Sequence, residues 1–300
     1  MSWIIFTISG AFFQNLRSSL QKKLNKDLSI VASTYVRFAF ALPFAILIFF
    51  LNFGNFEIIS KILKQTDFIY LTIIASIFQI LFTFTLLYLF NFSNFVVGTS
   101  LSKTEVVQVA IFEYFLLKDK LNIFGIFGII IATMGVIIIS VKDLKLFFSN
   151  FFSKTTFVGL LTGLFLGLSV VFFRAAALSL ENFSSNFDKA IITLFFGLII
   201  QTSIISIYLL VYQRSEFRKF KDNKLESCLA GFTGFLATLS WFFAFTFIQA
   251  SFVRALGQVE IFFSFVSSKY FFKEKITKME IIGIIIFVFG VTMMLLTRMN

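Results

Sequence analysis

Two clusters of charged and amide side chains lie inside long apolar stretches of the chain. Lys103 and Glu105 form the first cluster, and Arg254, Gln258 and Glu260 form the second. Because a charge in hydrocarbon is costly, such residues normally face a partner or a watery cavity. We therefore expect Lys103, Gln258 and Arg254 to contact a polar solute, with Glu105 and Glu260 as ion-pair partners or proton carriers. Fixed ion pairs with no role in binding a solute remain an open alternative.

The spacing within each cluster indicates which side chains share a helix face. Lys103 and Glu105 are two residues apart, or about 200° around a helix, so they cannot both face one cavity squarely. Glu105 and Gln108 share a face, as do Arg254 and Gln258. We therefore predict that the two helices carrying these clusters line one pathway.

Weaker candidates for the same pathway are amide and aromatic side chains in other apolar stretches. Amides often only bridge helices, and this interpretation is favoured for Gln201. Tyr88 and Trp241 could stack on a planar substrate, although aromatic residues more often pack or lie at the membrane interface. The full set is Gln14, Asn15, Gln79, Gln201, Tyr88 and Trp241.

Three further arginines, Arg17, Arg37 and Arg174, lie nearer the ends of apolar stretches. Long basic side chains at such positions can extend to the lipid headgroups while their stems stay in the apolar region. Two interpretations therefore carry equal weight for these arginines. They either reach the headgroups or face a partner inside the protein.

The residues that most enzymes use are scarce in this chain. It contains no His, which excludes His-based metal sites and Ser–His or Cys–His nucleophiles. The only Cys, Cys228, excludes an intrachain disulfide and a thiolate metal cluster. Ser100 and Lys103 fit a Ser-x-x-Lys pattern, but its companion motifs are missing. We predict no catalytic residue, no metal and no cofactor.

A membrane bundle must position these side chains. Of the 300 residues, 58% are hydrophobic and only 14% are charged, whereas a soluble domain has about 25% charged residues. A membrane-spanning helix needs about 20 mainly apolar residues. Ten segments meet this requirement, which predicts an all-α polytopic membrane protein. They are Ser2–Gln21, Ile30–Leu51, Phe68–Phe90, Phe95–Leu117, Ile123–Val141, Phe157–Leu180, Ala190–Gln213, Leu225–Ile248, Ala250–Phe272 and Glu280–Thr297.

An internal repeat relates the two halves of the chain. After a shift of 155 positions, Lys103 falls on Gln258 and Glu105 falls on Glu260. Charged residues and glycines at a fixed offset rarely coincide by chance, whereas apolar residues in membrane proteins often do. The matched glycines are Gly128 with Gly283 and Gly135 with Gly290.

The repeat predicts both architecture and packing. Residues 1–148 and 149–300 would each hold five helices, and an odd number inverts the second repeat in the membrane. We expect the matched glycines to pack the hairpin of the fourth and fifth helices and that of the ninth and tenth. Gly159, Gly163 and Gly167 recur every four residues, which predicts close approach of another helix.

The net charge of +11 is distributed unevenly among the loops. The loops after the first, fifth, seventh and ninth segments hold most of the loop Lys and Arg residues, for example Lys22, Lys145, Arg214 and Lys273. The positive-inside rule therefore puts these loops in the cytoplasm and both termini outside. Since loop asymmetry accounts for most of the charge, we predict no nucleic-acid partner.

The stretch 105–121 resembles the EamA-type repeat of the drug/metabolite transporter superfamily. In both halves an acidic residue is followed by an apolar helix, a second acidic residue 14 positions on, and a helix with two glycines seven apart. The common Pro after the first acid is Val106 or Ile261 here, and the turn Gly is Lys118 or Lys273. The matching residues are Glu105, Asp119, Gly128 and Gly135, and then Glu260, Glu274, Gly283 and Gly290.

The resemblance implies a ten-helix fold that moves amino acids, nucleosides, cofactors or similar small metabolites. We accordingly predict a secondary transporter that works by alternating access in a cell inner membrane. Its partners would be a small-molecule substrate and the lipid bilayer, and it would be a monomer or homodimer. The alternatives are a membrane-embedded enzyme acting on lipid and a non-transporting membrane scaffold.

Overall fold

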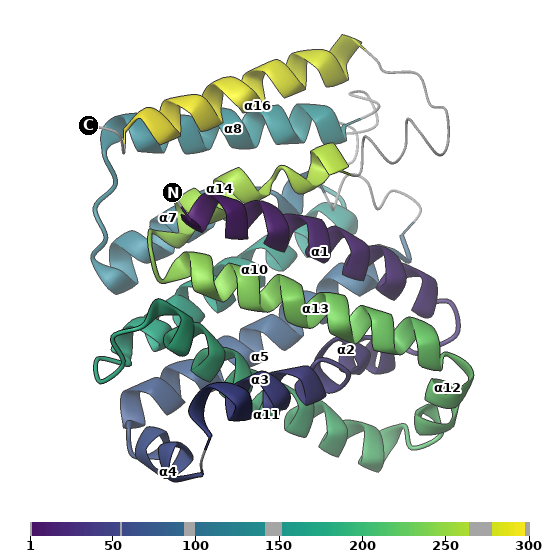
Figure 1. Cartoon of the computed structure of the whole chain (residues 1–300). Coiled ribbons are helices and arrows are strands. Elements are labelled where there is room, and N and C mark those ends of the chain that lie inside the picture. The colour runs from purple at the N-terminus through teal and green to yellow at the C-terminus, as the bar shows by residue number, and fades with distance from the viewer. Residues whose placement is uncertain (1, 55, 93–99, 142–151, 264–277, 298–300) are drawn as a thin grey trace.

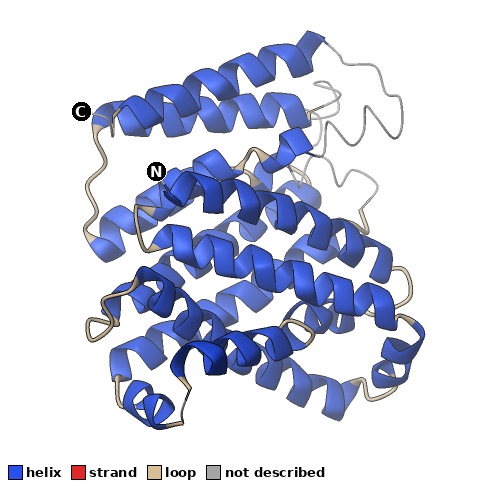
Figure 2. Cartoon of the chain, viewed as in Figure 1, coloured by secondary structure: helices blue, strands red, loops and turns tan. Residues whose placement is uncertain are grey.

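The computed structural model describes residues 2–54, 56–92, 100–141, 152–263 and 278–297. Every regular element within these residues is a helix (Figure 2). Six of the helical segments are long and apolar enough to cross a membrane. The start of the predicted fourth segment, the end of the ninth, and the turn at 273–276 lie outside the described residues.

The first half of the chain begins with helices whose ends match the predicted segments within a few residues. The predicted second segment is formed by two consecutive helices, and Pro43 lies at the start of the second of them. At that position a backbone N–H would have no acceptor within the helix, so the lack of an N–H in proline costs no hydrogen bond. Ser29 and Asn122 accept backbone N–H groups and so cap α2 and α8. The elements are α1 (Ser2–Leu24), α2 (Ile30–Ala39), α3 (Leu42–Phe53), α4 (Glu57–Leu63), α5 (Thr66–Leu89), α7 (Glu105–Phe112), the π-helix η1 (Glu113–Leu117) and α8 (Ile123–Ser140).

The second half of the chain has a similar order of long and short helices. Ser153 and Ser185 cap the first two of them. A short surface helix, α12, occupies the long polar stretch near residue 220. The elements are α10 (Lys154–Ser179), α11 (Asn186–Tyr212), α12 (Glu216–Asp222), α13 (Lys224–Phe245), α14 (Ala250–Gly257) and α16 (Lys278–Leu296).

Two helices are interrupted at matching positions in the two halves. Residues 100–102 are helical, Lys103 and Thr104 form a turn, and α7 starts at Glu105. In the second half, α14 ends at Gly257, a turn follows, and a helical stretch resumes at Glu260. In both places an acidic residue therefore begins the new helical stretch.

The long helices pack in pairs that join the first half of the chain to the second (Figure 1). α1 packs along α13, and α5 packs along α10. α2 and α3 contact α11, α7 contacts α14, and α8 lies along α16. The first helix of each half thus packs on the third helix of the other half. The second, fourth and fifth helices each contact their own counterpart.

The matched glycines lie between α8 and α16. A methyl group on Gly128 would lie 2.8 Å from the carbonyl oxygen of Gly290, and one on Gly135 would lie 2.7 Å from that of Gly283. The prediction that these glycines pack the hairpins of neighbouring helices is therefore wrong. They instead allow the last helices of the two halves to approach at backbone distance.

The glycines of α10 do mark a close helix contact. A methyl group on Gly163 would meet the carbonyl oxygen of Ser102 at 3.0 Å and the backbone N of Glu105 at 3.5 Å. Gly167 faces Val109 and Phe112 of α7. The predicted small-residue surface is thus confirmed for Gly163 and Gly167, and it lets α10 pack tightly against the interrupted helix.

Candidate functional site

A cavity of about 290 Å³ lies where the two halves of the chain meet. Its walls come from α1, α5, α8 and α10, from the stretch around the start of α7, and from α14 and the helical turn that follows it. Its lining combines charged and amide side chains with apolar ones. The lining residues are Gln14, Asn15, Arg17, Ser18, Phe82, Leu86, Phe90, Ser102, Lys103, Glu105, Ser140, Leu166, Arg254, Glu260 and Ile261.

Lys103 and Glu105 both line this cavity. The expectation that they cannot both face one cavity squarely is therefore wrong. That expectation assumed a continuous helix, in which the two side chains point about 200° apart. Because the helix is interrupted at Lys103 and Thr104, the helical rotation does not apply between them.

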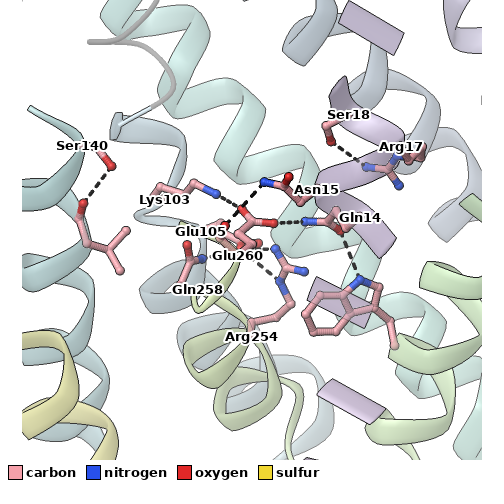
Figure 3. Close-up of polar contacts among 12 residues, drawn as sticks. Gln14, Asn15, Arg17, Ser18, Lys103, Glu105, Ser140, Arg254, Gln258 and Glu260 are labelled. Carbon is pink, nitrogen blue, oxygen red and sulfur yellow. Dashed lines mark hydrogen bonds and ion pairs between the residues drawn. The ribbon is translucent and has the colours of Figure 1, made fainter. Parts of the chain in front are cut away.

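Two ion pairs cross the cavity wall and join the two halves. The guanidinium of Arg254 donates from Nη2 and Nε to Oε1 of Glu105 at 2.5 and 3.0 Å. Both side chains are almost fully buried, at 4% and 1% exposure. Lys103 pairs with Glu260 in the opposite sense, with the cation in the first half and the acid in the second (Figure 3).

A hydrogen-bonded chain extends this network to α1 and α13. Gln14 donates from Nε2 to Oε2 of Glu260 at 2.6 Å, and its Oε1 accepts from Nε1 of Trp241 at 3.1 Å. The guanidinium of Arg254 lies 4.6 Å from the Trp241 ring centroid. Such a cation–π contact adds to the ion pair in fixing Arg254.

Four of the predicted contact residues do not line the cavity. The Gln258 amide donates to Oε1 of Glu105 at 3.1 Å, and Trp241 packs against Arg254. Gln79 accepts from Gln201 at 2.6 Å, which bridges α5 and α11 as expected for Gln201. Tyr88 stacks on Phe84 and lies 6.0 Å from the ammonium of Lys154.

The three arginines near helix ends are buried inside the protein. Arg17, Arg37 and Arg174 are 1%, 5% and 7% exposed. Headgroup snorkelling is therefore wrong for all three, because a snorkelling side chain would be accessible at its charged end. Of the three, only Arg17 is among the residues that line the cavity. The sequence had left open whether its side chain reaches the lipid headgroups or faces a partner inside the protein.

A second buried network, which the sequence patterns above do not predict, holds the start of α14. The fully buried carboxylate of Glu113 accepts the backbone N–H groups of Ala250 and Ser251 at 2.5 and 3.0 Å. Arg174 pairs with Glu113 at 3.1 Å and also with Asp119. The signal in the sequence was Glu113 itself, an acidic residue inside an apolar segment. Since α14 carries Arg254, this network positions the cavity wall.

The fold and the cavity together define a multi-pass membrane protein built from two repeats around a buried polar site. A model of the EamA-like transporter family matches residues 1–141 and again 153–296. The chain therefore belongs to the EamA-like transporter family of the drug/metabolite transporter superfamily. Members of this family are transporters, not enzymes.

Of two further comparisons, only the one with solved structures found a match, and it supports the fold alone. No curated protein matches the chain in sequence. A solved structure, titled only "Crystal structure of protein", superposes with a TM-score of 0.70 at 11% identity and covers 100% of this chain and 99% of its own. At this identity the match supports the fold and says nothing of the substrate.

Proposed function

We propose that the protein is a secondary transporter that moves a small metabolite across a cell inner membrane by alternating access. The supporting observation is the cavity between the repeats, whose two ion pairs each join one repeat to the other. A rocking motion that opens the cavity on one side must break or rearrange such contacts. Without a nucleotide-binding motif in the sequence, a gradient or exchange would drive the motion.

We propose ten spans, arranged as two inverted five-helix repeats at 1–148 and 149–300. The exchanged pairing of α1 with α13 and of α5 with α10 supports an approximate two-fold relation between the halves. The start of α1 and the end of α16 lie at the same end of the bundle, as an even number of crossings requires (Figure 1). The loop charges put that end outside the cell.

The cavity residues take distinct roles in this proposal. Lys103, Arg254 and Gln14 contact the substrate directly, because they line the cavity. Gln258 and Trp241 hold Glu105 and Arg254 in place, and Gln79 and Tyr88 shape the surrounding helices. Glu105 and Glu260 are ion-pair partners that release or exchange their cations during the cycle, with or without a proton.

Transport of an unmodified solute is the decisive measurement. Purified protein would be reconstituted into liposomes and supplied with labelled amino acids, nucleosides and small cofactors, and the contents would be analysed by mass spectrometry. We expect one class to accumulate unchanged above the level in protein-free liposomes. A chemically altered product would favour a membrane enzyme, and no movement of any compound would favour a scaffold.

The remaining partners follow from the same proposal. The small-molecule substrate and the lipid bilayer are the expected partners, and the net charge of +11 is assigned to loop asymmetry and not to nucleic acid. The working unit is a monomer or homodimer. Light scattering of the purified protein in detergent would distinguish these two states.

A further inference from the structure

The cavity has more cationic than acidic side chains among its described lining residues. Its cations are Arg17, Lys103 and Arg254, and its acids are Glu105 and Glu260. The two ion pairs, Lys103 with Glu260 and Arg254 with Glu105, occupy both acids. Arg17 is therefore the cation left over. A buried charge without an acidic partner is unfavourable and favours an anion arriving from outside.

Arg17 holds unused hydrogen-bond donors at the cavity wall. Its side chain is 1% exposed, and its Nη2 donates only to the hydroxyl of Ser18 at 3.5 Å, the outer limit of a hydrogen bond. Its Nε has no hydrogen-bond partner among the described residues. Glu260 attracts Arg17 through space, but its carboxylate already accepts from Lys103 and Gln14.

The packing of Arg17 fixes where its charged end lies. Its aliphatic stem crosses Gly234 of α13, where a methyl group on the glycine would lie 3.3 Å from Cδ of Arg17. The glycine thus gives room for the arginine between α1 and α13. Because the stem is packed between these two helices and the side chain is buried, the guanidinium is held and not free to extend to the solvent.

A second arginine adds positive charge behind Phe82, one of the residues that line the cavity. Arg37 is 5% exposed, donates from Nη1 to the hydroxyl of Thr83 at 2.6 Å, and lies 5.6 Å from the ring centroid of Phe82. Phe82 itself lines the cavity. Within the described part of the chain, no carboxylate forms an ion pair with Arg37.

We propose that the transported substrate is an organic anion whose carboxylate or phosphate binds Arg17. This inference rests on the proposed transport function and names its substrate class. A guanidinium matches carboxylate and phosphate oxygens in a bidentate manner, which suits Arg17. Lys103 faces the same cavity and adds a second positive contact. The apolar part of the anion packs on Phe82, Leu86 and Leu166.

The size of the cavity limits this anion. A volume of about 290 Å³ equals the space of about ten water molecules in the liquid. A dicarboxylate, an aromatic acid or a sugar phosphate fits such a volume. A dinucleotide cofactor does not. The mixed lining, which combines charged and amide side chains with Phe82, Leu86 and Leu166, favours an anion with a small hydrocarbon body.

Matched pairs of probes with and without charge test this inference. Melting temperatures would be measured with succinate and succinamide, benzoate and benzamide, and glycerol 3-phosphate and glycerol, for the wild type, Arg17→Gln and Arg218→Gln. The last variant loses the same charge from an exposed arginine of α12. We expect at least one anion to raise the melting temperature of the wild type and Arg218→Gln by a few degrees, with no response in Arg17→Gln.

Three results would overturn the proposal. The first is an equal response to a neutral probe, the second is the lack of response to every anion, and the third is an undiminished response in Arg17→Gln. Arg17→Lys serves if the glutamine variant does not fold. Lysine keeps the positive charge but cannot form the two parallel hydrogen bonds of a guanidinium, so we expect about tenfold weaker anion binding. Anion binding at wild-type affinity would contradict the role of Arg17.

Uptake by proteoliposomes separates this proposal from the proposed transport function. Uptake of neutral probes without competition by the anions would remove the anion assignment and leave transport intact. Anion binding at Arg17 without uptake of any probe would support the proposed anion site and contradict the proposed transport function. A different response to carboxylate and phosphate probes would show which of these two groups the substrate presents to Arg17.

Discussion

Arg254 of the second repeat and Glu105 of the first form a buried ion pair across the middle of the protein, at 2.5 Å. The pair joins α14 to the start of α7, the two interrupted helices that carry the charged clusters. It is reinforced by Gln258 and by the Trp241 ring. Because Glu105 and Arg254 also line the cavity, this ion pair contributes both to the stability of the fold and to the shape of the cavity.

Removing both partners of this pair should destabilise the protein by less than the sum of the two single removals. We expect Glu105→Gln and Arg254→Gln each to destabilise by about 3 kcal/mol, because each leaves a buried charge alone. The double variant should cost about 2 kcal/mol less than the sum. Melting temperatures of the four proteins measure this coupling. The exposed pair Lys23–Glu226 is the control, where coupling below about 1 kcal/mol is expected.

Replacing Lys103 with Ala should abolish most transport while the fold persists. Its side chain is 21% exposed at the cavity, so its loss leaves Glu260 without its cation but little apolar packing is removed. We expect at least about a tenfold lower uptake rate, and recovery of part of it in Lys103→Arg. Lys61→Ala, at an exposed position of α4, is the control. Normal uptake by well-expressed Lys103→Ala would exclude Lys103 from the pathway.

A single methyl group between α8 and α16 should destabilise the protein. In Gly290→Ala the new carbon would lie 2.3 Å from the backbone N of Ala132, which cannot move without separating the helices. We expect a cost of about 2 kcal/mol or more, seen as a lower melting temperature. Gly125→Ala is the comparison, because its nearest neighbour is a movable ring atom of Phe252 at 3.1 Å. Equal effects of both variants would contradict this packing.

Glycine at position 118 should stabilise the turn before α8. Lys118 has a φ of 59°, in the left-handed region where a side chain costs about 1 kcal/mol. Lys118→Gly removes this strain but makes the unfolded chain more flexible, so a net gain of about 0.5 kcal/mol is expected. Lys120→Gly relieves no such strain and should lower the melting temperature. A fall in both variants would show that Lys118 is unstrained.

The proposed topology predicts which loops react from outside the cell. Cys228 is the only cysteine, so Cys228→Ser gives a cysteine-free background. In that background, Lys61→Cys should react with a membrane-impermeant maleimide on intact cells, and Arg218→Cys should react only after permeabilisation. The reverse pattern would invert the orientation. Labelling of both from outside would contradict the proposed number of spans between them.

Much of the fold could be predicted because it depends on local patterns. Apolar length located the helices, and the repeated Glu105 and Glu260 indicated two related halves. The partner of each helix could not be predicted in the same way. The glycines at 128 and 290 signal close approach, but the sequence does not say which helix approaches, and neighbouring helices were the wrong choice.

The site was predicted less completely for two physical reasons. The helix interruption at Lys103 contains no Pro or Gly, so spacing rules for a continuous helix were applied where they do not hold. The burial of Arg17 depends on the room that Gly234 of a distant helix provides. The charged clusters were identified because charges are rare in apolar segments, whereas their partners depend on the tertiary fold.

The two interrupted helices carry unlike residues at their matching turns, Lys103 in one repeat and Gln258 in the other. If the repeats were identical, exchanging their conformations would convert the inward-facing form into the outward-facing form at equal free energy. An ammonium in one repeat opposite an amide in the other removes that equality. Under the proposed alternating-access mechanism, the empty carrier would therefore have a preferred resting side, and its inward and outward half-cycles would proceed at different rates.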